Sequence, residues 1–194
     1  MPFVGYDKEV GQMKELSLNI LDIVENSTKA KAEIVEITII DKNKDFSITI
    51  KDDGCGMNEA TLLSVSDPFY TTRTTRKVGM GIPLFRFAAE QTGGTLTITS
   101  KHIDEFPADH GTTLTATFDK SHIDFTPLGD IISTMVTLIQ GHPNVDFVLR
   151  HQLEDKIIML DTRELRAVLE DVPLDTFEVL EWIKENLEEQ YSNV

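Results

Sequence analysis

The chain has 194 residues, of which 40% are hydrophobic and 26% charged, and its formal net charge is −15. This length and hydrophobic content allow one domain with a packed core and exclude wholesale disorder. An acidic chain repels phosphate backbones, so we expect neither nucleic acid nor an anionic membrane as a partner. No apolar run is long enough to predict a transmembrane span.

The charge is unevenly distributed along the chain. Residues 1–120 hold 18 acidic and 13 basic side chains, a net of −5, and residues 121–194 hold 15 and 5, a net of −10. We therefore predict a compact domain over 1–120 and an acidic α/β extension over 121–194. The single cysteine, Cys55, excludes an internal disulfide, and the N-terminus lacks the features of a secretory signal, so we expect a cytoplasmic location.

Periodicity in residues 1–120 predicts helices alternating with pairs of strands. In the first helix Leu16, Ile20, Ile23, Val24 and Ser27 recur on one face. The expected helices cover residues 14–31, 57–65 and 82–92. The expected strands cover residues 34–40, 46–51, 95–100 and 112–118. Hairpin strands with helices on one face indicate an α+β fold, a two-layer α/β sandwich.

The extension has its own helical and β patterns. The expected helices cover residues 128–140, 162–171 and 174–191, and the expected strands cover 145–150 and 156–160. We expect Thr162 to be an N-cap. The last helix has Phe177, Leu180, Ile183 and Leu187 on one face and acids elsewhere. This apolar face could pack against the first domain or could bind a partner protein, and the sequence does not decide between the two.

A polar stripe runs along the first helix and contains Glu15, Asn19, Asp22, Asn26 and Lys29. A solvent-facing strip is the simpler interpretation, and the wall of a ligand cleft is the other. In a cleft, Asn26 could hold Mg²⁺ through its amide oxygen. Asp22 could orient a water as general base, and Lys29 could contact a phosphate as a point charge.

A second candidate is the segment DDGCGM, which directly follows a predicted strand. The carboxylate of Asp52 accepts hydrogen bonds only, so it suits an exocyclic amine such as that of adenine. Gly54 and Gly56 allow the backbone to approach a flat ligand closely. A tight turn is the simpler interpretation of this segment.

The third candidate is the loop DPFYTTRTTRKVGMG, which carries Arg73, Arg76 and Lys77. Gly79 and Gly81 lead into a helix whose free N–H groups suit an anion. An ordinary surface loop is the alternative, and the spacing of a P-loop is absent. Gly111-Thr112, at the start of a strand, is a fourth and weaker candidate.

The order and spacing of these segments resemble the GHKL superfamily of Bergerat-fold ATPases, which includes gyrase, histidine kinases and MutL-type proteins. ILDIVENSTKAKAEI resembles the N-box, DDGCGM the G1 box, DPFYTTR the histidine-kinase F-box and KVGMGIPL the G2 box. EQTGGTLTITS and GTTLTATF resemble the closing strands of a kinase ATP domain. The resemblance covers roughly residues 12–120. It implies a Bergerat fold, whose sheet is mixed and mostly antiparallel, and binding of ATP with Mg²⁺.

The resemblance also implies individual roles. Asn26 would chelate the Mg²⁺ that bridges the triphosphate, and Asp52 with Thr112 would recognise the adenine amine. Four more residues would shape the site through the G1 and G2 boxes, namely Gly54, Gly56, Gly79 and Gly81. Met57 belongs to the same G1 box and would contact the nucleotide. Three bases would offset the triphosphate charge, namely Lys29, Arg73 and Lys77.

Two departures from the family bear on function. The ATPase branch has a glutamate where this chain has Asp22, one methylene shorter, so we expect slow or absent hydrolysis. We also find too few residues before the N-box for a phospho-acceptor helix pair, and no histidine in an H-box context. These departures favour a nucleotide-dependent regulatory module with a protein partner. The alternative is a protein kinase that phosphorylates a separate partner, as anti-sigma-factor kinases do.

Overall fold

The computed structural model describes residues 15–66 and 81–193, so Arg73, Arg76, Lys77 and Gly79 lie outside the described residues. The strands are β1 (Ile34–Lys42), β2 (Asp45–Asp52), β3 (Leu96–Lys101), β4 (Gly111–Asp119), β5 (Asp146–Leu153) and β6 (Lys156–Asp161). The helices are α1 (Leu16–Lys29), α2 (Glu59–Ser66), α3 (Gly81–Gln91), α4 (Ile131–Gly141), α5 (Thr162–Leu169) and α6 (Phe177–Ser192). Every helix and strand predicted above is confirmed, with shifted boundaries. No helix in these two ranges is long and apolar enough to cross a membrane.

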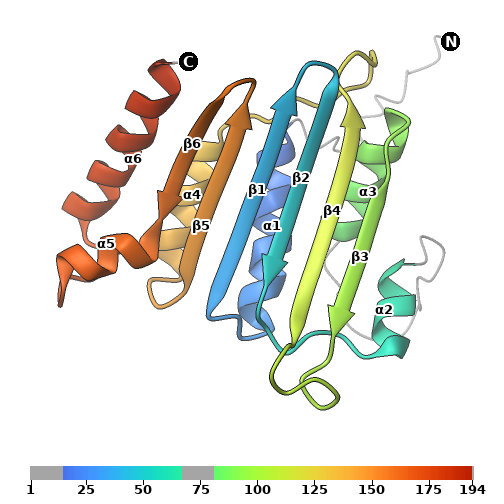
Figure 1. The fold of residues 1–194 in the computed structure, drawn as a ribbon, viewed down its shortest axis with the longest axis horizontal. Helices are drawn as coiled ribbons and strands as arrows, with labels where there is room; N and C mark the ends of the chain where they lie inside the picture. The colour runs from blue at the N-terminus through green and yellow to red at the C-terminus, as the bar shows by residue number, and fades with distance from the viewer. Residues whose placement is uncertain (1–14, 67–80, 194) are drawn as a thin grey trace, which may run out of the picture.

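All six strands form one sheet, in the order β3-β4-β2-β1-β5-β6 (Figure 1). The pair β1–β5 is parallel and the other four pairs are antiparallel. The expected mixed, mostly antiparallel sheet is therefore confirmed. The strands of the extension continue the sheet of the first 120 residues, because β5 pairs with β1 along its length.

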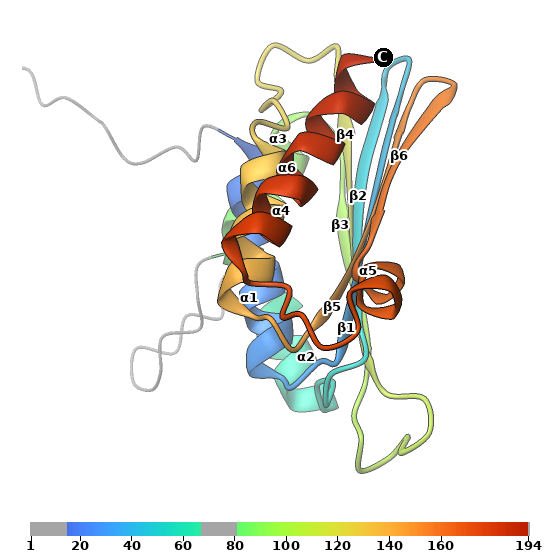
Figure 2. The same ribbon diagram turned by 90° about the vertical axis from the view of Figure 1, so that its left-hand side faces the viewer.

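Helices α1, α3, α4 and α6 cover one face of the sheet, and α5 lies on the other side (Figure 2). The strands alternate accordingly, because successive side chains point to opposite faces. On β1 the helix-side residues Val35, Ile37 and Ile39 are fully buried, and Phe147 and Leu149 continue this layer on β5. One apolar core thus runs from the first domain into the extension.

Two details of the extension differ from the sequence prediction. Thr162 was expected to be the N-cap of α5, but the side chain of Asp161 accepts a hydrogen bond from the Arg163 N–H at 3.0 Å and is the cap. Thr162 is buried and its hydroxyl instead accepts from the Phe147 N–H at 2.8 Å. On α6, Phe177 is 71% exposed and Val179 takes its place on the buried face. Phe177 is the first residue of α6, and it does not share the burial of Leu180, Ile183 and Leu187, with which helical spacing grouped it.

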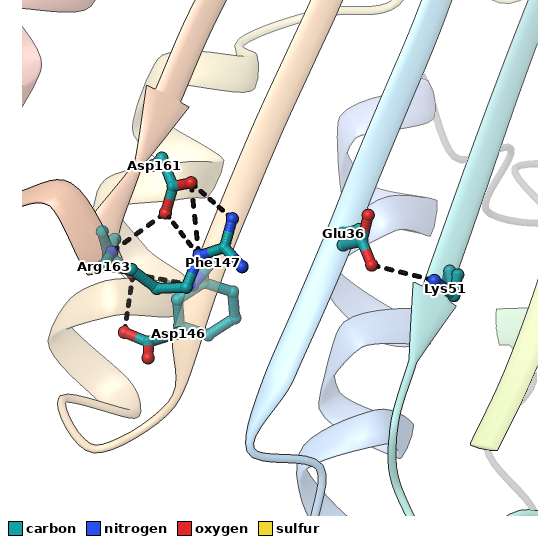
Figure 3. Close-up of polar contacts among 7 residues, drawn as sticks. Glu36, Lys51, Asp146, Phe147, Asp161 and Arg163 are labelled. Atoms are coloured by element: carbon teal, nitrogen blue, oxygen red, sulfur yellow. Dashed lines mark hydrogen bonds and ion pairs between the residues drawn. The ribbon is translucent and has the colours of Figure 1, made fainter. Parts of the chain in front are cut away.

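The face of the sheet opposite the helices carries charged pairs (Figure 3). Lys51 and Glu36 lie directly opposite each other on β2 and β1, and their side chains form an ion pair at 3.0 Å. At the start of α5, Arg163 pairs with Asp161 at 2.6 Å. The Lys51–Glu36 pair is exposed, so it contributes little to stability.

Phe147 tests whether the core is shared. We expect Phe147→Ala to lower the free energy of unfolding by about 3–5 kcal/mol, because it removes a fully buried ring. Val148→Ala, on the opposite face of β5, is the control and should have a smaller effect. Urea denaturation should show one transition for both variants. Two transitions, of which Phe147→Ala shifts only one, would instead support independent domains at 1–120 and 121–194, a division that stays a prediction.

The burial of His151 leads us to expect that the stability of the fold depends on pH. It is buried on β5, and its Nδ1 hydrogen-bonds the Tyr191 hydroxyl of α6 at 2.8 Å. Burial lowers the pKa of His151, which Asp41 raises and Lys120 lowers to smaller extents. Because the folded state disfavours the imidazolium, the unfolded state binds the extra proton, and stability should fall as the pH falls below the ordinary value of 6.5.

The measurement is the free energy of unfolding at about pH 7.5 and about pH 5.5, on either side of the ordinary pKa of histidine. We expect His151→Gln to reduce the difference between the two values. His122→Gln, at an exposed histidine, should leave the difference unchanged. An equal pH dependence in wild type and His151→Gln would contradict the assignment.

Candidate functional site

A cavity of about 240 Å³ lies between the sheet and helices α1, α2 and α3. Its wall combines apolar side chains of the core with a few polar groups, as small-molecule sites usually do. The cavity is lined by Ile23, Asn26, Ser27, Ala30, Ile50, Asp52, Gly56, Met57, Val65, Ile82, Ile98, Thr112 and Leu114.

A polar residue ends the apolar helix-side row of each of three neighbouring strands, and two of these residues, Asp52 and Thr112, line the cavity. Asp52 pairs with Thr112 across β2 and β4, and Thr112 pairs with Ser100 across β4 and β3. Each of these residues points to the helix-covered face of its strand, where the other side chains of that strand are apolar. The side-chain oxygens of Ser100 and Thr112 are 2.9 Å apart. Three neighbouring strands thus place one row of polar side chains beneath the helices.

The carboxylate of Asp52 is held by donors from three directions. Its Oδ2 accepts from the Ser27 hydroxyl at 2.6 Å. Its Oδ1 accepts from the backbone N–H groups of Gly54 at 3.0 Å and Thr112 at 3.2 Å. These bonds fix the carboxylate, which still has acceptor capacity for a ligand amine because two carboxylate oxygens offer about four lone-pair sites.

Ser27 and Ser100 are site residues that the sequence analysis did not assign. Ser27 lies on the apolar face of α1 and is buried. A buried hydroxyl needs a hydrogen-bond partner, so its position on that face was an available signal. Ser100 had no comparable signal, because its contacts with Thr112 and with the Met57 N–H, at 2.7 Å, depend on strand pairing.

Asn26 lines the same cavity as Asp52, from the facing helix α1. The two side chains therefore share one space rather than lying on opposite sides of the molecule. Other residues of the polar stripe do not line the cavity as Asn26 does. Asn19 is buried, and Lys29 is largely exposed and lies 3.9 Å from Glu25. The stripe is neither a uniform solvent-facing strip nor a uniform cleft wall.

The glycines of the G1 segment permit close backbone approaches. Gly54 is buried, and a Cβ there would lie 3.0 Å from the Ala30 Cβ. Its carbonyl oxygen is 2.7 Å from His110 Nδ1. Gly56 has φ +68°, and a Cβ there would lie 2.0 Å from the Lys101 carbonyl oxygen. Gly56 and Met57 line the cavity, whereas Gly54 is not one of its lining residues.

Asp22 and Gly81 meet outside the lining of the cavity. A Cβ on Gly81, the first residue of α3, would lie 2.8 Å from the Asp22 Cβ, so only glycine allows this approach of α1 and α3. Asp22 is exposed there, beside the helix start. The proposed roles of Asp22, Lys29 and Gly81, like those of the cavity residues, stay predictions.

Comparisons with known proteins identify the family and the fold. A segment of this chain is 35% identical over 66 residues to a "Putative sensor protein" of Shewanella frigidimarina, covering 32% of this chain and 10% of that protein. The Aquifex aeolicus MutL ATPase domain complexed with ADP has a TM-score of 0.51 at 15% identity, covering 93% of this chain and 70% of that one. The N-terminal domain of a DNA repair protein has a TM-score of 0.52 at 16% identity, covering 77% and 53%.

The likeness to solved structures shows the fold alone, and the chain spans about a tenth of the curated relative's length. The family model described as "Histidine kinase-, DNA gyrase B-, and HSP90-like ATPase" matches residues 11–122, more than half of the chain. This match includes α1, the G1 segment and all strands of the cavity. The chain has the Bergerat fold and belongs to the family of histidine kinase-, DNA gyrase B- and HSP90-like ATPases.

Proposed function

We propose that this protein binds ATP with Mg²⁺ and acts as a nucleotide-dependent regulatory module. The observation that supports this most directly is the cavity shared by Asn26 and Asp52, on facing elements of an ATPase fold. Membership of the family makes ATP the expected ligand. A protein partner and a cytoplasmic location belong to the same proposal.

In this proposal the adenine lies in the cavity between α1 and the sheet. Asp52 accepts a hydrogen bond from the exocyclic amine, and the hydroxyl of Thr112 contributes beside it. Ile50, Ile98 and the other apolar lining residues offer a surface for the faces of the base. Because Gly56 has no side chain, the base can lie close to the backbone at this part of the cavity wall.

The phosphates would extend from the base toward Asn26 and the start of α3. The donor set fits Mg²⁺, because the side-chain oxygen of Asn26 is the hard ligand that this ion accepts together with phosphate oxygens and water. When bound, the ion would neutralise phosphate charge. The N-terminus of α3 would contribute free N–H groups at Gly81. Arg73, Lys77 and Gly79 complete the proposed phosphate site from outside the described residues.

Turnover by this site is expected to be slow. Asp22 lies beside the start of α3, where the phosphates are proposed to lie, and would serve as a weak general base with a short side chain. The second candidate is a kinase acting on a separate partner, which the match to the histidine kinase-, DNA gyrase B-, and HSP90-like ATPase family supports. Incubation with labelled ATP separates the two, because hydrolysis releases phosphate and a kinase transfers label to a protein.

The adenine and metal roles are tested by calorimetry with ATP and Mg²⁺. We expect Asp52→Ala and Asn26→Ala each to weaken binding by at least ~10-fold, which corresponds to about 1.4 kcal/mol. Asp124→Ala, an exposed carboxylate outside the cavity, is the control for lost charge. Wild-type affinity in both cavity variants would contradict the proposed function.

Gly56 tests the wall of the cavity. Gly56→Ala should weaken ATP binding and destabilise the fold, because the added Cβ would meet the Lys101 backbone. Gly93→Ala is the matched control, since Gly93 has φ +78° but open space around its Cβ position. We expect Gly93→Ala to lose about 1–2 kcal/mol of stability from φ alone, with unchanged affinity. Equal effects of the two variants would show that the wall does not need this close approach.

A further inference from the structure

The extension supplies the backbone caps of α1, the helix that carries Asn26. The first N–H groups of a helix have no partner within it. The side chain of the N-cap residue Glu15 does not cap α1. Instead the N–H groups of Leu16 and Ser17 donate to the carbonyls of Pro127 and Leu128, at 2.9 and 2.8 Å.

The same region connects the start of α1 to the start of α4. Gly129 has φ +77°, and a Cβ there would lie 2.4 Å from Glu15 Oε2. The next residue, Asp130, donates its N–H to that oxygen at 3.3 Å and caps α4 by accepting from the Ser133 N–H at 2.8 Å. The two helices therefore begin from one set of contacts.

A side-chain contact joins the two helices again at their other ends. His142, the C-cap of α4, has its Nε2 2.7 Å from Glu25 Oε1 on α1. The pair is partly shielded, with His142 25% and Glu25 37% exposed at the side chain. Between the two ends, buried residues of α1 and α4 belong to one core, including Ile20, Met135 and Leu138. α1 is thus bound to α4 at both ends and along its length.

Glu25 directly precedes Asn26, so the two side chains leave the helix about 100° apart. Asn26 lines the cavity while Glu25 is held by α4. Holding Glu25 therefore fixes the rotation of the last turns of α1 about its axis. It also keeps the Glu25 carboxylate paired and turned away from the region proposed to receive phosphates, which would otherwise repel it.

We propose that His142 is a positioning residue for the nucleotide site and that the extension controls nucleotide affinity through the Glu25–His142 contact. This inference rests on the proposed function. A partner that shifts α4 would rotate α1 and move Asn26, and nucleotide binding would by linkage change the affinity for that partner. The segment 121–194 then has a regulatory role in addition to its packing role.

The test is a double-mutant cycle read by calorimetry with ATP and Mg²⁺ on the full chain. We expect Glu25→Ala and His142→Ala each to weaken binding by about fivefold, the lower range of a typical coupling. The loss of affinity in the double variant should be less than the two single losses combined, because both changes remove the Glu25–His142 contact, while Glu25→Ala also removes the 3.9 Å contact with Lys29. His142→Gln, which can still donate to Glu25, should restore most of the affinity. The control His122→Ala removes an exposed histidine side chain of the extension that pairs with Asp124.

Wild-type affinity in His142→Ala, an effect equal to that of His122→Ala, or fully additive single effects would overturn the proposal. Amide hydrogen exchange without nucleotide gives a second readout. His142→Ala should speed exchange at residues 24–30 and leave β3 and β4 unchanged. If wild type binds no nucleotide, the proposed function fails, while unchanged exchange at residues 24–30 separately rejects the positioning role.

Discussion

The candidate site depends on one carboxylate that is held in place before any ligand arrives. Asp52 ends a strand whose helix-side residues are otherwise apolar, and donors from α1, the G1 turn and β4 fix both of its oxygens. Because these donors come from both α1 and the sheet, Asp52 keeps all of its hydrogen bonds only if the distance between α1 and the sheet is maintained. A partly buried acceptor that loses a donor costs free energy, so these hydrogen bonds link the local geometry of the site to the packing of α1 against the sheet.

The spacing of α1 over the sheet is in turn set by the extension. The chain returns after β4, caps α1 with the carbonyls of Pro127 and Leu128, and places α4 against it. β5 then pairs in parallel with β1, and α6 covers the remaining core of that side (Figure 2). The acidic extension therefore completes the sheet and supports the helix that carries Asn26. The apolar residues of the extension therefore recur on the faces that pack into the shared core, while its many acidic residues lie outside that core.

Much of the fold was predictable because its signals are local. Apolar periodicity and turn residues located most helices and strands, and the order of the motifs indicated the family that residues 11–122 match. Errors occurred where a tertiary contact decided a residue's role. Thr162 resembles a cap in sequence, yet its hydroxyl binds the backbone of β5 and Asp161 caps the helix. Helical spacing likewise grouped Phe177 with Leu180, Ile183 and Leu187, but the helix begins at Phe177 and leaves its ring exposed.

The sequence by itself determined which residues have the chemistry to bind a nucleotide. A carboxylate at a strand end, closely spaced glycines and an asparagine on a helix can all be recognised without the tertiary structure. Only the tertiary structure decided which of them meet. Asn26 and Asp52 share a cavity while Lys29, on the same stripe, lies outside it, and Ser27, Ser100 and His110 join the site through contacts across the chain. The physical reason is that periodicity specifies a face of an element, whereas the partner of that face depends on strand register and helix packing between distant segments.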